Sequence, residues 1–170
     1  DKALAELSKA IALKPDSADA YEHMGVAYSY KGAYEKAIAS FEKALGFEDS
    51  RVSVYNELAE VYMHSRNKDL AIMNFKKALS LDPYHSSARN NLGVILAERG
   101  LTRNAIEEFE KVRQFDPTHT ESAFNLARAY ALSGKTDKAI RQYQELIKLN
   151  PDFLEAHYNL GVLYLNLLHK

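Results

Sequence analysis

The chain repeats with a period of 34 residues along its whole length, and this regularity limits its fold more than any other feature. In each period an alanine is followed four residues later by a bulky side chain, and a proline or aspartate comes eight residues after that. These three columns hold Ala3, Ala37, Ala71, Ala105 and Ala139; Leu7, Phe41, Phe75, Phe109 and Tyr143; and Pro15, Asp49, Pro83, Pro117 and Pro151. A repeat of this length is one supersecondary unit that cannot bury its own apolar face, so it stacks on its neighbours. The sequence therefore predicts an array of stacked repeats.

The other half of each period has the pattern of an amphipathic helix. A Leu or Met is followed by a small residue and, three residues later, by Tyr or Leu. The columns read Met24, Leu58, Leu92, Leu126 and Leu160; Gly25, Ala59, Gly93, Ala127 and Gly161; and Tyr28, Tyr62, Leu96, Tyr130 and Tyr164. Apolar residues four apart lie on one helical face. The small residue between them allows a second helix to approach closely.

Residues at the turns indicate where each helix begins and ends. A Gly or Asn that can adopt the left-handed conformation ends the first helix of each pair, at Gly32, Asn67, Gly100 and Gly134. Proline ends the second helix. We expect Asp16, Thr118 and Asp152 to cap the following helices, with Glu121 and Glu155 completing capping boxes. Each period thus predicts two antiparallel helices.

These columns resemble the tetratricopeptide repeat, whose pattern places an aromatic, Leu-Gly, Tyr, Ala, aromatic, Ala and Pro across 34 residues. The resemblance covers all 170 residues. It departs at Arg89, Ala123 and His157, where the pattern has an aromatic, and at Asp49, where it has proline. The resemblance implies an all-α fold in which antiparallel helix pairs stack into a right-handed α-α superhelix with a concave groove.

The period divides the chain into a single array of four full repeats between two half repeats. The full repeats are 18–51, 52–85, 86–119 and 120–153, with a lone second helix in 1–17 and a lone first helix in 154–170. Two interpretations stay open. The chain is a segment of a longer superhelix, or its apolar last helix pairs with the first helix of another copy through Leu163, Leu165, Leu167 and Leu168. That heterologous contact would build a fibre or a ring.

No catalytic residue, cofactor or metal site is expected. The chain has no cysteine, none of its six histidines pairs at a spacing of three or four, and no phosphate-binding or nucleophile motif is present. We expect His85 and His119, which share one column, to be solvated turn residues. The absence of cysteine fits a reducing compartment such as the cytoplasm. No signal peptide is visible at the N-terminus.

Charge and hydropathy argue against nucleic acid and membrane partners. The formal net charge is −1, so the chain has no overall attraction to polyanions. The basic pairs Lys76–Lys77 and Lys111 with Arg113 fall on second helices, where a solvated outer surface is the simplest interpretation. No apolar run approaches the ~20 residues that cross a bilayer.

The resemblance implies that ligands lie in the groove, against first-helix residues that do not pack within the hairpin. The residues before the Leu/Met column are His23, Glu57, Asn91, Asn125 and Asn159. Three asparagines at this spacing would form a ladder, and each amide can donate to and accept from a peptide bond. The ladder resembles that of the peptide-binding superhelix of the nucleocytoplasmic N-acetylglucosaminyltransferase.

Flanking positions extend the expected contact surface. We expect Asn56, Asn90, Phe124, Tyr158 and Arg128 to contribute, with Glu22, Glu57, Glu60 and Glu98 making the N-terminal half acidic and the C-terminal half more apolar. Repeats that grip the acidic tails of heat-shock chaperones carry basic residues at the positions held here by Asn90, Glu155 and Asn159. That binding mode is therefore not expected.

The sequence predicts a scaffold or adaptor that binds a protein or peptide in its groove and is not an enzyme. Two alternatives stay open: an array that assembles through its apolar end helices, and a segment that recruits substrates to a larger enzyme.

Overall fold

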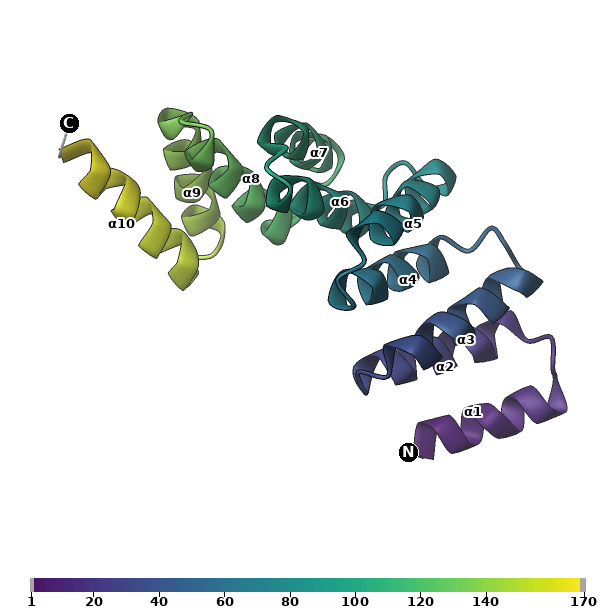
Figure 1. Ribbon diagram of the computed structural model, residues 1–170. Coiled ribbons are helices and arrows are strands. Elements are labelled where there is room, and N and C mark those ends of the chain that lie inside the picture. The colour runs from purple at the N-terminus through teal and green to yellow at the C-terminus, as the bar shows by residue number, and fades with distance from the viewer. Residues whose placement is uncertain (1, 169–170) are drawn as a thin grey trace. The chain divides into compact units, whose positions relative to one another are not determined.

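The computed structural model describes residues 2–168, and within this range all regular structure is helical: ten α-helices and no strand (Figure 1). The expected fold class, all-α with antiparallel helix pairs, is confirmed. The chain forms two compact units, which divide between Ala88 and Arg89 and are described separately. Residue 1, His169 and the end of the expected half repeat 154–170 lie outside the described residues.

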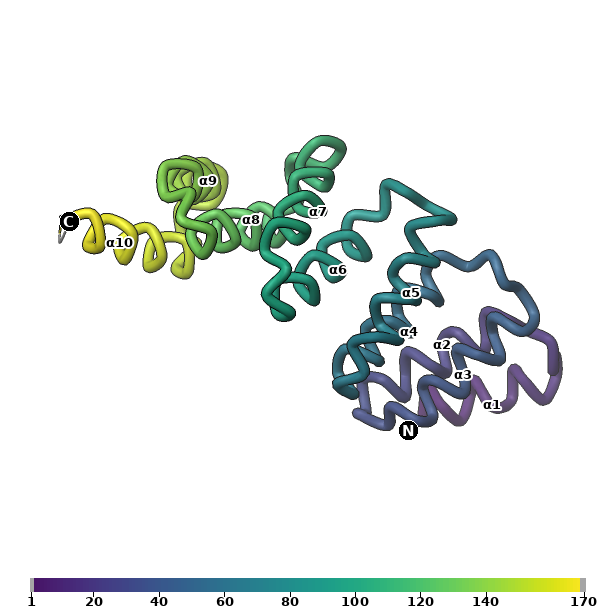
Figure 2. Tube along the Cα trace, turned by 45° about the horizontal axis from the view of Figure 1, so that its top comes forward, coloured from purple at the N-terminus to yellow at the C-terminus, as the bar shows by residue number. Residues whose placement is uncertain are grey.

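Unit 1 holds five helices whose neighbours in sequence lie side by side (Figures 1 and 2). The helices α2 and α3 pack as one hairpin, α4 and α5 as the next, while α1 packs on α2 and α3 packs on α4. Their bounds are α1 (Lys2–Leu13), α2 (Ala18–Tyr30), α3 (Tyr34–Phe47), α4 (Val52–His64) and α5 (Lys68–Leu81).

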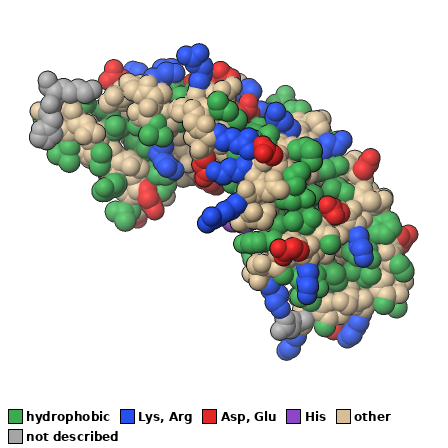
Figure 3. All heavy atoms as spheres, in the orientation of Figure 1, with side chains coloured by type: hydrophobic (Ala, Val, Ile, Leu, Met, Phe, Trp, Pro, Cys, Tyr) green, Lys and Arg blue, Asp and Glu red, His purple; other side chains and the backbone are tan. Residues whose placement is uncertain are grey.

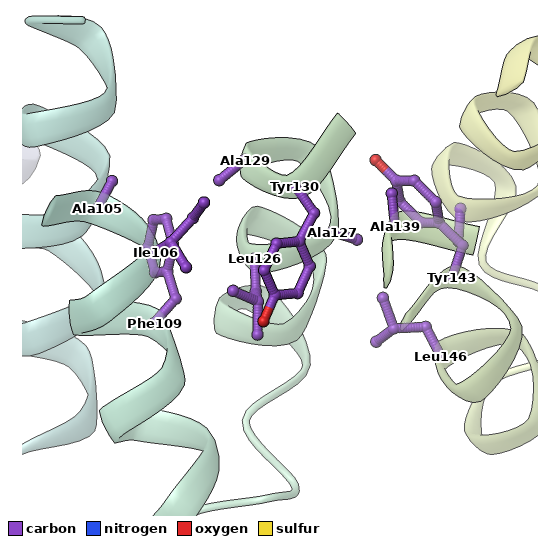
Figure 4. Packing of buried hydrophobic residues seen from close by; sticks show 11 residues of the cluster. Ala105, Ile106, Phe109, Leu126, Ala127, Ala129, Tyr130, Ala139, Tyr143 and Leu146 are labelled. Atoms are coloured by element: carbon purple, nitrogen blue, oxygen red, sulfur yellow. The ribbon is translucent and has the colours of Figure 1, made fainter. Parts of the chain in front are cut away.

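Unit 2 continues the same alternation of first and second helices. Its core lies where α8 packs on both α7 and α9, and α10 packs on α9 (Figure 4). The bounds are α6 (Ser86–Glu98), α7 (Thr102–Phe115), α8 (Thr120–Leu132), α9 (Thr136–Leu149) and α10 (Leu154–Leu168). The first helices α2, α4, α6, α8 and α10 begin at residues 18, 52, 86, 120 and 154. The organisation as a single array with two half repeats stays a prediction.

Within a hairpin, the small residue of the first helix receives the aromatic ring of the second. A Cβ added at Gly25 would lie 2.6 Å from two ring carbons of Phe41, and one added at Gly93 would lie 2.5 Å from the ring of Phe109. Both rings are at most 1% exposed. The absence of a side chain at these glycines therefore sets how closely the two helices approach.

The turns between paired helices use the left-handed backbone, at one position in a different way from the expectation. Gly32, Gly100 and Gly134 have φ between 69° and 76°. In the second hairpin Arg66 takes this conformation with φ 62°, and Asn67 instead caps α5 by accepting from the Leu70 amide. The second hairpin therefore has the same left-handed turn as the others, although the turn contains no glycine.

The caps of α2 and α8 lie one residue later than expected. Ser17 accepts from the Ala20 amide at 3.3 Å, and His119 Nδ1 accepts from the Ser122 amide at 3.1 Å. His85 caps α6 in the same way, through a 3.2 Å bond from the Ala88 amide. The expected caps Asp16 and Thr118 lie one residue before Ser17 and His119, and Asp152 lies two residues before the start of α10. His85 and His119 lie in turns as expected, but they are half-buried helix caps and not freely solvated side chains. A histidine at this column satisfies an otherwise unpaired amide of the first helical turn.

We predict that Gly25→Ala and Gly93→Ala each lower the free energy of unfolding by about 1–3 kcal/mol, because the added methyl overpacks a closed core. Gly161 provides the matched control, because it lies in the same column but no atom lies within 4 Å of a Cβ placed there. Gly161→Ala should raise stability by about 0.5–1 kcal/mol through helix propensity. Urea unfolding measures all three variants, and equal effects would contradict the account.

Candidate functional site

A pocket on the first-helix face of unit 2 lies between α8 and α10. It has a volume of about 470 Å³ and is lined by Phe124, Arg128, Leu154, Glu155, Tyr158 and Asn159. Four of these were expected from the sequence: Phe124, Arg128, Tyr158 and Asn159. Leu154 and Tyr158 are 74% and 69% exposed. The pocket thus offers two large apolar side chains to a ligand.

Phe124 forms the fixed wall of this pocket. Its ring lies 5.9 Å from the Tyr143 ring and 5.2 Å from the Phe153 ring, measured between centroids. The Arg128 guanidinium lies 5.8 Å from the Phe124 centroid, over the ring. Within the described residues Arg128 has no carboxylate partner, so its charge is held in place by the ring and stays available.

Arg128 also lines a second pocket, which lies among α6, α7 and α8. This pocket has a volume of about 180 Å³, and its lining includes Val94, Glu98, Asn125 and Leu132. Burial of the Tyr143 side chain in the core behind Phe124 raises the pKa of its phenol to about 12. One exposed cation therefore connects two pockets that otherwise present mainly apolar walls.

Asn90 lies elsewhere than expected. It is 1% exposed, its Nδ2 donates to Glu121 Oε1 at 3.0 Å, and its Oδ1 accepts from Asn125 Nδ2 at 3.1 Å. Its amide therefore joins α6 to α8. Asn91 is half-buried and lies next to this network, with its Oδ1 3.4 Å from Asn90 Nδ2. Asn90 holds neighbouring hairpins together, so it has no surface to offer a ligand.

Of the acids expected in the N-terminal half of the groove, Glu22 and Glu60 are hydrogen-bonded within unit 1, whereas Glu98 lies on α6 and lines the pocket of about 180 Å³ in unit 2. Asn56 is 7% exposed and donates to Glu60 Oε1 at 2.9 Å. Glu22 accepts from Arg51 and from Ser53. Desolvation, followed by the charges of Glu60 and Glu22, raises the pKa of the half-buried Glu57. Asn56 is thus a packing residue, while Glu57 is an acid whose charged form the folded structure disfavours.

The structure brings together only part of the predicted contact set. Asn125 and Asn159 each line one of the two pockets described above, whereas Asn91 lines neither. Leu154 was missed, because it is the first residue of α10 and lies outside the columns that mark the hairpin. The ladder as a ligand contact stays a prediction.

The apolar side chains of α10 divide between the core and the surface. Leu163 packs against the core cluster of unit 2, whereas Leu165, Leu167 and Leu168 are 57%, 43% and 81% exposed. Figure 3 shows hydrophobic side chains on the visible face of α10. These three leucines are thus large apolar side chains that the described structure leaves exposed on this helix.

Among residues 2–168 no group of three or more His, Asp or Glu side chains is arranged to hold a metal ion. No helix in that range is both long and apolar enough to cross a membrane.

We predict that Glu57→Gln raises the free energy of unfolding at pH 7. A raised pKa means that the folded state disfavours the charged carboxylate, so ionisation of Glu57 costs stability above its ordinary pKa. The gain should disappear as the pH falls below about 4, where the carboxyl is protonated in both the folded and unfolded states. Urea unfolding across this range measures the difference. A gain that is the same at every pH would contradict the electrostatic cause.

Comparisons with known proteins agree with this geometry. Family models described as TPR repeat and tetratricopeptide repeat match residues 1–32 and 127–167, and residues 18–50 and 52–85, respectively. No curated protein matches the chain. Among solved structures, YrrB, a TPR protein with an unusual peptide-binding site, is 25% identical, with a TM-score of 0.79 over 94% of this chain and 82% of that chain.

Two further structures share the fold at lower identity. MamA from Desulfovibrio magneticus RS-1 is 21% identical, with a TM-score of 0.80 over 88% of this chain and 84% of that chain. The pilF protein of Pseudomonas aeruginosa is 23% identical, with a TM-score of 0.81 over 89% of this chain and 69% of that chain. Together with the paired helices and their ring-on-glycine contacts, the matches to the two repeat-family models show that the chain belongs to the tetratricopeptide repeat family, whose members bind protein or peptide partners.

Proposed function

We propose that the chain is a scaffold or adaptor without catalytic activity, and that it binds a segment of a partner protein on the first-helix face of unit 2. The observation that carries the proposal is the pocket between α8 and α10. Four side chains expected from the sequence to contact a ligand line it together. YrrB, which shares the fold and 25% of its sequence, is described as having a peptide-binding site.

The apolar side chains of the pocket supply most of the affinity in this proposal. Tyr158 and Leu154 are largely exposed, and aromatic anchors in concave sites dominate binding energy. Arg128 contributes orientation, because an exposed ion pair gives only about 0.2–1 kcal/mol. Asn125 and Asn159 supply amides that can pair with a peptide backbone. The favoured ligand is a peptide with a large apolar side chain close to an acidic group.

We predict that peptides selected from a random display library against the chain lose about tenfold or more in affinity with Tyr158→Ala, because truncating an anchor costs about 2 kcal/mol. Tyr84→Ala is the matched control, because Tyr84 is 72% exposed but lies in the turn before α6. Fluorescence anisotropy with labelled peptides gives the dissociation constants. Peptides that bind both variants equally well would remove the first-helix face of unit 2 from the proposal.

A second candidate function, self-assembly, is favoured by the exposed leucines of α10. In this proposal Leu165, Leu167 and Leu168 contact another copy, with Leu163 as a half-buried support. A contact that uses different surfaces on the two copies is open-ended and extends into fibres or rings.

We predict for this candidate that the mass measured by light scattering grows with concentration, and that Leu165→Glu with Leu168→Glu returns the chain to a monomer. Met73→Glu is the control, because Met73 is 58% exposed on a second helix of unit 1. A wild-type chain that stays monomeric at high concentration would exclude self-assembly.

The remaining alternative, recruitment of substrates to an enzyme, uses the same face as the scaffold. The peptide measurements above would then describe substrate capture.

A further inference from the structure

Unit 2 has a second set of pockets on the outer side, between its two second helices. Since α8 packs on both α7 and α9, the surface between those helices is floored by residues of α8 (Figure 4). Three adjoining pockets share Arg113. Arg113 is ion-paired with Glu145 at 2.7 Å, which joins α7 to α9. We call this surface the α7–α9 trough.

One end of the trough is apolar. A pocket of about 330 Å³ is lined by the apolar residues Pro117, Ala123, Leu146 and Leu149, together with Arg113, Gln142, Glu145 and Lys148. Leu149 is 76% exposed, whereas Leu146 is 2% exposed and forms part of the core. A large apolar side chain entering here would cover Leu149, which nothing described in the structure covers. The lining is consistent with an anchor position for a single side chain.

The other end of the trough is cationic. A pocket of about 230 Å³ is lined by Arg113, Tyr130, Lys138, Arg141, Gln142 and Glu145. Lys138 lies over the Tyr130 ring, 5.2 Å from its centroid. Within the described residues Lys138, Arg141 and the neighbouring Lys148 have no carboxylate partner. The carboxylates of the trough are already used, since Glu145 pairs with Arg113 and Glu110 accepts from the Tyr130 hydroxyl.

Between the two ends lies a buried amide with an unused acceptor. Gln142 is 4% exposed and lines both pockets. Its Nε2 donates to Glu145 Oε2 at 2.8 Å, which fixes the orientation of the amide, because a carboxylate needs a donor. The Oε1 atom has no hydrogen-bond partner. A buried acceptor without a donor is unfavourable, and an N–H group entering the trough would relieve that cost.

We propose that the α7–α9 trough binds an acidic segment of a partner protein that carries one large apolar side chain. The apolar side chain occupies the pocket against Leu149, the carboxylates pair with Lys138 and Arg141, and a backbone N–H of the segment donates to Gln142 Oε1. The match of charge selects an acidic segment. Nucleic acid fits less well, because the trough has an apolar end and holds two carboxylates, and the chain as a whole carries a net charge of −1.

This surface is distinct from the first-helix face, because it is formed chiefly by α7 and α9. The proposal therefore stands apart from the proposed function. If both are right, the chain holds two segments at once, one on each side of unit 2, and acts as a bridge between partners.

The probe for this proposal is the acetylated and amidated peptide Glu-Asp-Trp-Glu-Glu. The chain contains no tryptophan, so the indole emission reports the peptide alone. We expect saturable binding that weakens with added salt. Replacing the four acids with Lys, or the Trp with Ala in a dye-labelled peptide, should each weaken binding at least tenfold.

Variants of the chain then locate the probe. Lys138→Glu with Arg141→Glu should weaken binding at least tenfold, whereas Lys76→Glu with Lys77→Glu, an equal change of charge on α5, should leave it unchanged.

Gln142→Leu should weaken binding several-fold while the chain stays at least as stable to urea, because it removes the unpaired acceptor. A loss of stability together with binding would instead point to a structural role. Tyr158→Ala should leave probe binding unchanged, which separates this test from that of the first-helix face.

Three results would overturn the proposal. The probe fails to bind at millimolar concentration, it binds the Lys138/Arg141 variant as well as the wild type, or a single-stranded oligonucleotide binds the trough more tightly than the acidic peptide does.

Discussion

The contact of an aromatic ring in the second helix with a side-chain-free position in the first is the constraint on which the hairpins depend. Phe41 against Gly25 and Phe109 against Gly93 bring the backbones close enough to bury both rings almost completely. A hairpin built this way covers one side of each helix and leaves the rest for its neighbours. Stability then resides in the contacts between adjacent hairpins as much as within each one.

Polar contacts between first helices determine how neighbouring hairpins are oriented in this packing. In unit 1 Arg51, at the start of α4, bonds with Asp19 and Glu22 on α2, and these contacts lower the pKa of Asp19. In unit 2 the Asn90 amide joins the first helices α6 and α8 in a similar way, through its hydrogen bonds with Glu121 and Asn125. These bonds fix how one first helix sits against the next, and in unit 2 Asn125, which donates to Asn90, also lines a pocket.

The sequence predicted the helices better than it predicted the site. The period gave the starting residues of the first helices, because apolar spacing, small residues and prolines act locally. Whether Asn56 and Asn90 are exposed or buried depends on the rotation of one hairpin against another, which no single column encodes. Both side chains proved to be buried. The capping role of His85 and His119 was missed because the cap was expected one position earlier, at the residue that directly follows the proline. The α7–α9 trough combines residues from three helices, so no motif signals it.

Native-state amide hydrogen exchange tests the central claim most directly, namely that each hairpin is stabilised by its neighbours. Among the described residues α1 has no buried side chain and α10 has one, whereas α4, α8 and α9 have at least four each. The account predicts a graded set of opening free energies, lowest in α1 and α10 and highest in the helices that pack on both sides. One common opening free energy for every helix from α1 to α10 would contradict it.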